Sequence, residues 1–294
     1  KQAEGILKEF SPDLVIGTGG YVSVPVLWSA IRKKLPVYIH EQNAFPGLAN
    51  RMLGRFAEGI FISFPESEKY FKQKNKILLT GNPVRKEFML SGIVDYRAKH
   101  GISPNEFLIL SFGGSRGAEK INSAILELAA GLSEIPATKL IHITGTGYYD
   151  EFCRRLNEKG IRGKDNITVL PYTDIMHEYM LASDLVISRS GAITVAELTA
   201  CGKPSILIPS PNVTANHQYY NAKSIADRGG GILIEEKELT DEKLKGAVMR
   251  LMNNRKALNA MSEVSSSLGR ADGADAIFSA LELRHGFQNI PDPG

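Results

Sequence analysis

The chain is poor in the features that mark several large protein classes. Its 294 residues include only two cysteines, Cys153 and Cys201, which stand far apart without C-x-x-C spacing. Isolated cysteines argue against a disulfide framework or a zinc site, and they fit a reducing cytoplasm. No apolar run approaches the roughly 18 residues of a membrane-spanning helix. The net charge is only +3, so the composition gives no sign of a nucleic-acid-binding protein.

Short apolar runs alternate with helical patterns along the whole chain. The runs that we expect to be strands are 14–16, 36–39, 59–62, 77–79, 107–112, 140–143, 167–170, 184–187 and 232–234. Strands that alternate with helices predict parallel sheets with helices on both faces. Two Gly-rich strand-to-helix turns, at Gly17 and Gly113, indicate two such halves. We therefore expect an α/β protein with two doubly wound, Rossmann-like domains that face a ligand-binding cleft.

The first Gly-rich turn departs from a dinucleotide-binding fingerprint. The G-x-G-x-x-G pattern that starts at Gly17 requires glycine at position 22, where the chain has Val22. This weakens the interpretation as a nicotinamide-dependent dehydrogenase, which stays as an alternative.

The stretch 188–222 contains a short helix with clear start and stop signals. Ser190 is expected to be its N-cap, and Gly202 followed by Pro204 marks its end. Gly191 and Ala192 would let an anion approach the backbone N–H groups of the first turn. Glu197 lies roughly 10 Å further along the axis, about the distance from a nucleotide's diphosphate to its ribose. The alternative is a capped core helix with an exposed glutamate.

Polar residues follow two of the strands expected in the first half. His40, Glu41 and Asn43 belong to a polar run at the carboxyl end of one strand, and Arg85 follows another. Ligands bind at this edge of open α/β sheets, and an arginine there can reach a phosphate. A surface arginine is the alternative for Arg85. Trp28 and Ile31 precede three cations and could touch an anionic membrane surface, but we favour the alternative, a buried Trp28 with a solvated basic tail.

Six motifs together resemble a known family. They are Gly17–Ser23, His40–Asn43, Gly81–Arg85, Gly113–Ala118, Arg189–Ala192 with Glu197, and His217–Ala222. In this order they are similar to the MurG family of UDP-N-acetylglucosamine:undecaprenyl-pyrophosphoryl-muramoyl-pentapeptide N-acetylglucosaminyltransferases. The resemblance implies a GT-B fold whose first domain lacks its N-terminal Gly-rich loop, so the chain as given could be an inactive fragment.

The resemblance also implies domain limits. Residues 1–85 would be a partial acceptor-binding domain and 106–270 the UDP-sugar-binding domain. The stretch 86–105 between them is polar and helical, with turns at Gly101 and Ser103–Pro104, and this composition predicts a linker. The C-terminal helix and tail, 271–294, would return toward the N-terminal domain.

Site residues carried over from the family fall into three groups. Gly19, Gly20 and Tyr21 would contact the acceptor's pyrophosphate. His40 or Glu41 could act as the general base, as could a histidine of the family's N-terminal Gly-rich loop, which would lie upstream of Lys1. The donor would be bound by Asn43, Arg85, Gly114, Ser115, Gly117, Tyr172, Thr173, Ser190, Gly191, Ala192, Ile193, Glu197, His217 and Gln218. His217 stands where the family is expected to have glutamine, so its role is open.

The implied reaction is inverting transfer of N-acetylglucosamine to the muramoyl sugar of a lipid-linked peptidoglycan precursor, lipid I to lipid II. It would take place at the inner face of the bacterial plasma membrane, with the protein bound there peripherally. The chain has no Asp-x-Asp pair, so we expect neither a metal nor a cofactor. A UDP-N-acetylglucosamine 2-epimerase and a non-catalytic UDP-sugar-binding protein remain the alternatives.

Overall fold

A computed structural model describes residues 1–89, 92–114 and 116–286. The chain divides into two compact units. The first comprises Lys1–Val84 and the segment that begins at Arg270, and the second comprises Arg85–Gly269. Each is a parallel α/β unit, as the alternating pattern predicts.

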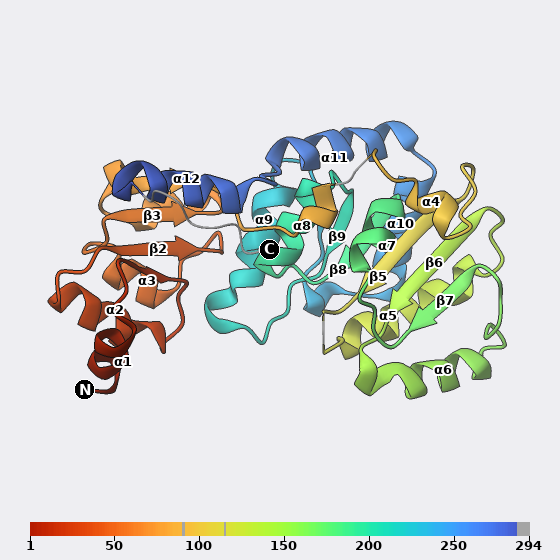
Figure 1. The fold of residues 1–294 in the computed structure, drawn as a ribbon. Coiled ribbons are helices and arrows are strands. Elements are labelled where there is room, and N and C mark those ends of the chain that lie inside the picture. Colours follow the sequence, from red (N-terminus) through yellow and green to blue (C-terminus); the bar gives the residue numbers. More distant parts are fainter. Residues whose placement is uncertain (90–91, 115, 287–294) are drawn as a thin grey trace. The chain divides into compact units, whose positions relative to one another are not determined.

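The first unit is built on a four-stranded parallel sheet of order β1-β2-β3-β4 (Figure 1). Its strands are β1 (Val15–Gly17), β2 (Val37–Glu41), β3 (Gly59–Ile62) and β4 (Ile77–Leu79). Its helices are α1 (Gln2–Phe10), α2 (Ser23–Arg32), α3 (Leu48–Leu53), the 3-10 helices η1 (Pro65–Tyr70) and η2 (Lys74–Lys76), and α12 (Gly273–His285).

Alternation along β2 separates the two faces of this sheet. Val37 and Ile39 are buried in a core with residues of α1, α2 and α3. Tyr38 points to the opposite face, where it forms a cluster with Phe61 of β3 and Leu281 of α12. The Tyr38 hydroxyl lies 2.7 Å from Nε2 of His285 at the end of α12. The C-terminal helix therefore covers one face of the N-terminal sheet.

The second unit contains a six-stranded parallel sheet of order β10-β9-β8-β5-β6-β7. Its strands are β5 (Phe107–Phe112), β6 (Thr138–Ile143), β7 (Ile167–Leu170), β8 (Leu185–Ser188), β9 (Ser205–Leu207) and β10 (Ile232–Leu233). Its α-helices are α4 (Tyr96–Lys99), α5 (Glu119–Leu132), α6 (Tyr149–Glu158), α7 (Met176–Ala182), α8 (Ala192–Ala200), α9 (His217–Ala226), α10 (Asp241–Met252) and α11 (Arg255–Leu268). Its 3-10 helices are η3 (Lys86–Met89), η4 (Thr146–Tyr148), η5 (Thr214–Asn216) and η6 (Glu236–Glu238).

The central strands of this sheet are buried on both faces. Ile109 and Ile187 pack against α5, α6 and α10 in the largest core of the unit. Leu108 and Leu110 point the other way and are equally buried. Continuous apolar strands of this kind are typical of parallel sheets covered by helices on both sides.

Residues 86–105, expected to be a linker, belong instead to the second unit. Phe88 is completely buried, and Tyr96 and Ile102 are also buried. The guanidinium of Arg97 donates to Oδ2 of Asp184, just before β8, at 2.9 Å. These few anchors hold a mostly polar segment onto the domain, which its composition alone does not reveal.

Candidate functional site

A pocket lies at the carboxyl edge of the second sheet. From β5 the chain continues to β6 and β7 on one side, whereas β8 and β9 lie on the other side, so the loops after β5 and β8 diverge. Such switch points are the usual ligand sites of open α/β sheets. The pocket has a volume of about 240 Å³ and is lined by Arg85, Phe112, Gly114, Ile143, Gly145, Pro171, Tyr172, Thr173, Asp174, Met176, Thr194 and Glu197.

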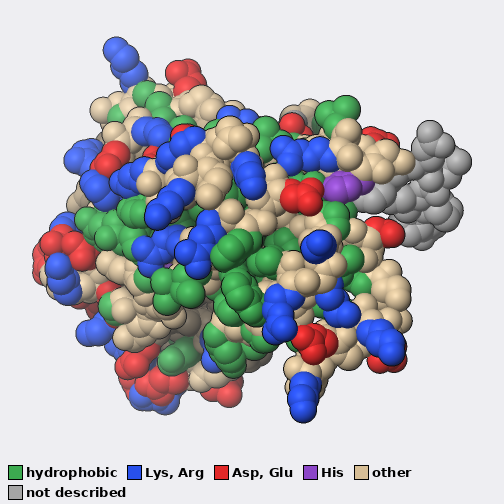
Figure 2. Space-filling model, turned by 90° about the vertical axis from the view of Figure 1, so that its left-hand side faces the viewer, with side chains coloured by type: hydrophobic (Ala, Val, Ile, Leu, Met, Phe, Trp, Pro, Cys, Tyr) green, Lys and Arg blue, Asp and Glu red, His purple; other side chains and the backbone are tan. Residues whose placement is uncertain are grey.

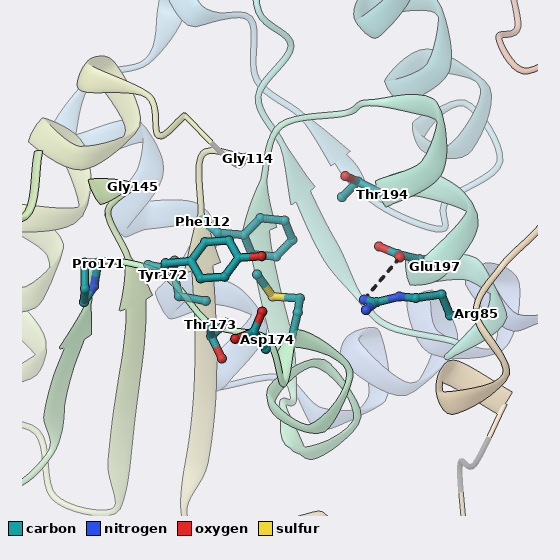
Figure 3. Close-up of a pocket in the computed structure, with 12 residues that line it drawn as sticks. Arg85, Phe112, Gly114, Gly145, Pro171, Tyr172, Thr173, Asp174, Thr194 and Glu197 are labelled. Atoms are coloured by element: carbon teal, nitrogen blue, oxygen red, sulfur yellow. Dashed lines mark ion pairs between the residues drawn. The ribbon is translucent and has the colours of Figure 1, made fainter. Parts of the chain in front are cut away.

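Glu197 and Arg85 form a charged pair in this pocket (Figure 3). Oε1 of Glu197 lies 3.8 Å from Nη2 of Arg85, and the side chain of Glu197 is only 14% exposed. Burial raises the pKa of Glu197 to about 7, although the positive charge of Arg85 acts in the opposite direction. The Glu197 carboxyl group therefore titrates near neutral pH. In the free protein, Arg85 does not fully compensate the cost of burying its negative charge.

Thr194 and Glu197, three residues apart on α8, both project into the pocket. The expected N-cap is wrong, however. The helix begins at Ala192 with Gly191 as its N-cap residue, and the buried hydroxyl of Ser190 donates to the carbonyl of Gln218 at 2.8 Å. A tertiary partner has replaced the local capping bond, so the Ser190 side chain points to α9.

The start of α9 is tied to the same loops. Oε1 of Gln218 accepts a hydrogen bond from the backbone N–H of Ser210 at 2.9 Å. The side-chain amide of Asn221 donates to the carbonyl of Ser190 at 3.3 Å. His217 and Gln218 begin the helix but are not among the residues that line the pocket. Ile193, in the first turn of α8, is 44% exposed and also lies outside the lining.

The glycine loop after β5 contributes differently at each position. Gly114 lines the pocket with a φ of 92°, and a Cβ placed there would meet nothing within 4 Å. Gly117 instead packs so closely on the next loop that a Cβ would lie 2.1 Å from the carbonyl oxygen of Thr144. Ser115, expected to bind the diphosphate, lies outside the described residues.

Tyr172 and Thr173 follow β7 and line the pocket, as the resemblance implies. The Tyr172 side chain is 55% exposed, and Oγ1 of Thr173 accepts from the backbone N–H of Ile175 at 3.2 Å. Sequence reasoning omitted several lining residues, namely Phe112, Ile143, Gly145, Pro171, Asp174, Met176 and Thr194. Most of them end or directly follow β5, β6 and β7, so the carboxyl-edge rule could have found them.

The first unit places Glu41 in a structural role. The strand β2 extends to Glu41, which is 1% exposed. Its carboxylate accepts four hydrogen bonds: from the backbone and side-chain nitrogens of Asn43 at 2.9 and 3.2 Å, from the Gly47 N–H at 3.0 Å and from Asn50 at 2.8 Å. A carboxylate so fully occupied holds its own loop together, and this contradicts the expectation of a general base at Glu41.

His40 is equally enclosed. It is 5% exposed, and its Nε2 lies 3.1 Å from the Gly81 carbonyl and 3.2 Å from Oγ of Ser63. Burial lowers the pKa of His40, so the ring is neutral at pH 7. The ring is engaged with the loop after β4, so His40 also lacks the access that a base requires.

The residues expected to contact the acceptor lie in the loop after β1. Gly19 and Gly20 have positive φ angles of 89° and 75°, and Tyr21 is 87% exposed. Trp28 is not buried: it is 43% exposed and packs edge-on against Phe56 at 5.4 Å. Ile31 is partly buried against the core.

Two features are absent from the part of the chain that the structure describes. No group of three or more His, Cys, Asp or Glu side chains there is arranged to hold a metal ion. No helix in the same residues is long and apolar enough to cross a membrane.

Family models match both halves of the chain. Residues 1–62 match the glycosyltransferase family 28 N-terminal domain, and residues 108–277 match the C-terminal domain of that family. An N-acetylmuramyl-(pentapeptide) pyrophosphoryl-undecaprenol N-acetylglucosamine transferase from Acetivibrio thermocellus is 44% identical over 281 residues, which are 96% of this chain and 75% of the relative. The enzyme of the same name from Clostridioides difficile is 44% identical over 96% of this chain and 68% of its own length.

Solved structures show the same architecture. The crystal structure of Acinetobacter baumannii MurG matches with a TM-score of 0.77 and 27% identity, over 96% of this chain and 77% of that chain. A Neisseria meningitidis UDP-GlcNAc 2-epimerase bound to UDP-GlcNAc has a TM-score of 0.70 but only 16% identity over 96% of this chain and 79% of that chain, so it shares the fold alone. The chain therefore belongs to the MurG family, with the two parallel α/β domains of the GT-B fold.

Proposed function

We propose that this chain transfers N-acetylglucosamine from UDP-N-acetylglucosamine to the muramoyl sugar of a lipid-pyrophosphate-linked peptidoglycan precursor. The relatives that are 44% identical over almost the whole chain bear the name of this transferase. The observation that carries the proposal for this chain is the pocket of the second unit, where Glu197 and Arg85 lie 3.8 Å apart.

UDP fits the chemistry of this pocket. Arg85 supplies a partly solvated cation for the diphosphate, and the open position at Gly114 lets phosphate oxygens approach the loop after β5. Glu197 accepts from the two ribose hydroxyls, which offset the cost of burying its charge. Tyr172 and Thr173 contact the uracil. The side-chain oxygen of Gln218 accepts a hydrogen bond from the Ser210 N–H, so the NH₂ group of Gln218 is the part that can donate to a sugar.

The barrier falls mainly through stabilisation of the departing UDP. Negative charge develops on its diphosphate as the acceptor hydroxyl attacks the anomeric carbon from the opposite side. Arg85 and the loop amides are already in place when that charge develops, which is the efficient form of electrostatic catalysis. Glu41 and His40 are committed to loop contacts, so neither is assigned as the base.

A transfer assay with labelled UDP-N-acetylglucosamine and a lipid-linked muramoyl-pentapeptide tests the proposal. We expect label in the lipid product, and a loss of donor affinity of at least tenfold in Glu197→Ala, about 1.4 kcal/mol. Glu242→Ala, an exposed glutamate on α10, is the matched control.

Other outcomes of the assay would support one of the alternative functions. Release of free N-acetylmannosamine and UDP would support the epimerase, and UDP-sugar binding without turnover would support a non-catalytic protein. Equal donor affinity in Glu197→Ala and Glu242→Ala would contradict the proposed site.

We also infer that the first unit binds an anionic membrane surface peripherally. Trp28, Leu48, Met52 and Phe56 are exposed hydrophobic residues of α2, α3 and the turn after α3. Arg51, Arg55 and Lys72 line a neighbouring hollow of about 270 Å³. Figure 2 shows hydrophobic side chains gathered on one face with Lys and Arg side chains around them. Apolar insertion together with basic charge is the combination that holds peripheral proteins on anionic lipid.

A further inference from the structure

A buried polar network lies behind the glycine loops of the pocket. It consists of Asn122 on α5, His142 on β6 and Thr144 just after β6, all of them at most 5% exposed. None of the three lines the pocket. Buried polar groups are held by specific hydrogen bonds, so each of these bonds fixes the orientation of the groups that it joins.

Asn122 fixes the position of one backbone carbonyl. Its Nδ2 donates to the carbonyl oxygen of Thr144 at 3.1 Å. That oxygen is the atom against which Gly117 packs, 2.1 Å from where a Cβ of Gly117 would lie. Gly145 also packs against this loop, since a Cβ on it would lie 2.6 Å from the nitrogen of Gly117. The loops after β5 and β6 are therefore in backbone contact at the carbonyl that Asn122 holds.

His142 determines which way the Asn122 amide points. Nε2 of His142 lies 3.2 Å from Oδ1 of Asn122, and Nδ1 lies 3.3 Å from the carbonyl of Ser111. The ring is completely buried, which lowers the pKa of His142 to about 3, so it carries a single N–H at neutral pH.

Only one tautomer is compatible with the bond to Thr144. With the hydrogen on Nε2, His142 donates to Oδ1 of Asn122 and leaves the Asn122 NH₂ directed at Thr144. The unprotonated Nδ1 then faces the Ser111 carbonyl at 3.3 Å, which is the longest of the three contacts, so this tautomer gives up only that contact. With the hydrogen on Nδ1, Nε2 would need a donor, and the amide would have to turn its oxygen toward the Thr144 carbonyl. Two acceptors would then face each other without a hydrogen.

We propose that Asn122 is a positioning residue for the nucleotide diphosphate, oriented by the Nε2–H of His142 and acting through the Thr144 carbonyl on the glycine loops after β5 and β6. The proposal rests on the proposed function, because it takes the pocket to be the UDP site. Gly114 and Gly145 are the two loop residues through which the effect reaches the pocket.

Calorimetric titration of the chain with UDP provides the first test. Asn122→Ala is expected to raise the Kd for UDP by about tenfold, because the Thr144 carbonyl loses a buried hydrogen bond. Asn166→Ala is the matched control. Nδ2 of Asn166 also donates to a backbone carbonyl at 3.1 Å, that of Leu132, but at the amino end of β7. We expect its Kd to stay within about twofold of the original.

Two substitutions of His142 test the tautomer and remain informative even if Asn122→Ala fails to fold. The amide nitrogen of glutamine can take the place of Nε2, whereas that of asparagine takes the place of Nδ1. His142→Gln should therefore keep UDP affinity within about threefold, and His142→Asn should weaken it about as much as Asn122→Ala. The melting temperature of each variant shows how far it is destabilised.

The outcomes separate this proposal from the proposed function. The positioning role is wrong, and the UDP site stands, if Glu197→Ala weakens UDP binding but Asn122→Ala does not. If Asn122→Ala does not fold, His142→Asn takes its place in this comparison. Equal affinities of His142→Gln and His142→Asn would also overturn it. If the unsubstituted chain fails to bind UDP, both proposals fall.

Discussion

Glu197 combines a cost in stability with a role in binding. Burial raises its pKa to about 7, so the folded state binds more protons than the unfolded state between the ordinary pKa of 4.5 and 7. Stability therefore falls as the pH rises through this window and stays low above it. A buried group that destabilises the free protein is expected where a ligand supplies the missing partners.

Glu197→Gln should accordingly be more stable than the original chain at pH 8, by on the order of 2 kcal/mol, and about equally stable at pH 4. The same substitution should weaken UDP binding. Denaturant unfolding at the two pH values and a UDP titration check the two effects. A variant that is less stable at pH 8 would contradict the assigned environment of Glu197.

Glu41 should behave as a stabilising residue. Its carboxylate accepts four hydrogen bonds from the loop after β2, so Glu41→Ala is expected to destabilise the first unit by about 2–4 kcal/mol. Glu68→Ala, which removes a half-exposed glutamate in η1, should change stability by less than about 0.5 kcal/mol. Unchanged stability with lost transfer activity would instead restore Glu41 as the base.

At the scale of single elements, the strands were predictable and the helix starts were not. The central strands of the second sheet are mostly apolar because both of their faces are buried, and such runs are visible in the sequence. Ser190 is a good local N-cap, yet its hydroxyl bonds to Gln218, 28 residues away. Likewise, β2 continues to Glu41 because hydrogen bonds from Asn43, Gly47 and Asn50 stabilise the buried Glu41 carboxylate. Long-range partners of this kind leave no local pattern.

The short helix η3 supports Arg85 and offers a test at this scale. Phe88 is completely buried, and the guanidinium of Arg85 lies over its ring at 5.0 Å. Phe88→Ala is expected to destabilise the second unit by about 3–5 kcal/mol and to weaken UDP binding, because Arg85 loses its support. Met89→Ala, at the exposed neighbouring position, is the control and should leave both nearly unchanged. Normal UDP affinity in folded Phe88→Ala would show that the ring does not position Arg85.

At the scale of the whole molecule, the repeating strand–turn–helix pattern predicted two parallel α/β units, and this is confirmed. Gly114 and Glu197, which the sequence placed in the donor site, both line the pocket at the carboxyl edge of the second sheet. The predicted start of the second domain at residue 106 was wrong, because the second unit begins at Arg85. Only a few buried side chains attach residues 85–105 to this unit, so the segment looks polar in the sequence. The average composition of the segment hides these few buried side chains, although its packing depends on each of them.

The proposed membrane surface is also a property of the molecule as a whole. Charge reversal at both Arg51 and Arg55 should release the protein from vesicles that contain anionic lipid, since each basic residue near the surface contributes about 1 kcal/mol. Lys237→Glu with Arg250→Glu, two exposed positions of the second unit, is the matched control. Cosedimentation at low and high salt measures the effect. Equal binding by both double variants, or to purely zwitterionic vesicles, would contradict the assignment.

The central claim is that UDP occupies the pocket at the start of α8, and a crystal structure of the chain soaked or grown with UDP tests it most directly. The account predicts the ribose hydroxyls within hydrogen-bond distance of the Glu197 carboxylate and the diphosphate beside Arg85 and Gly114. UDP bound elsewhere on the second unit, for example in the hollow beside Ser210 and Glu236, would contradict it.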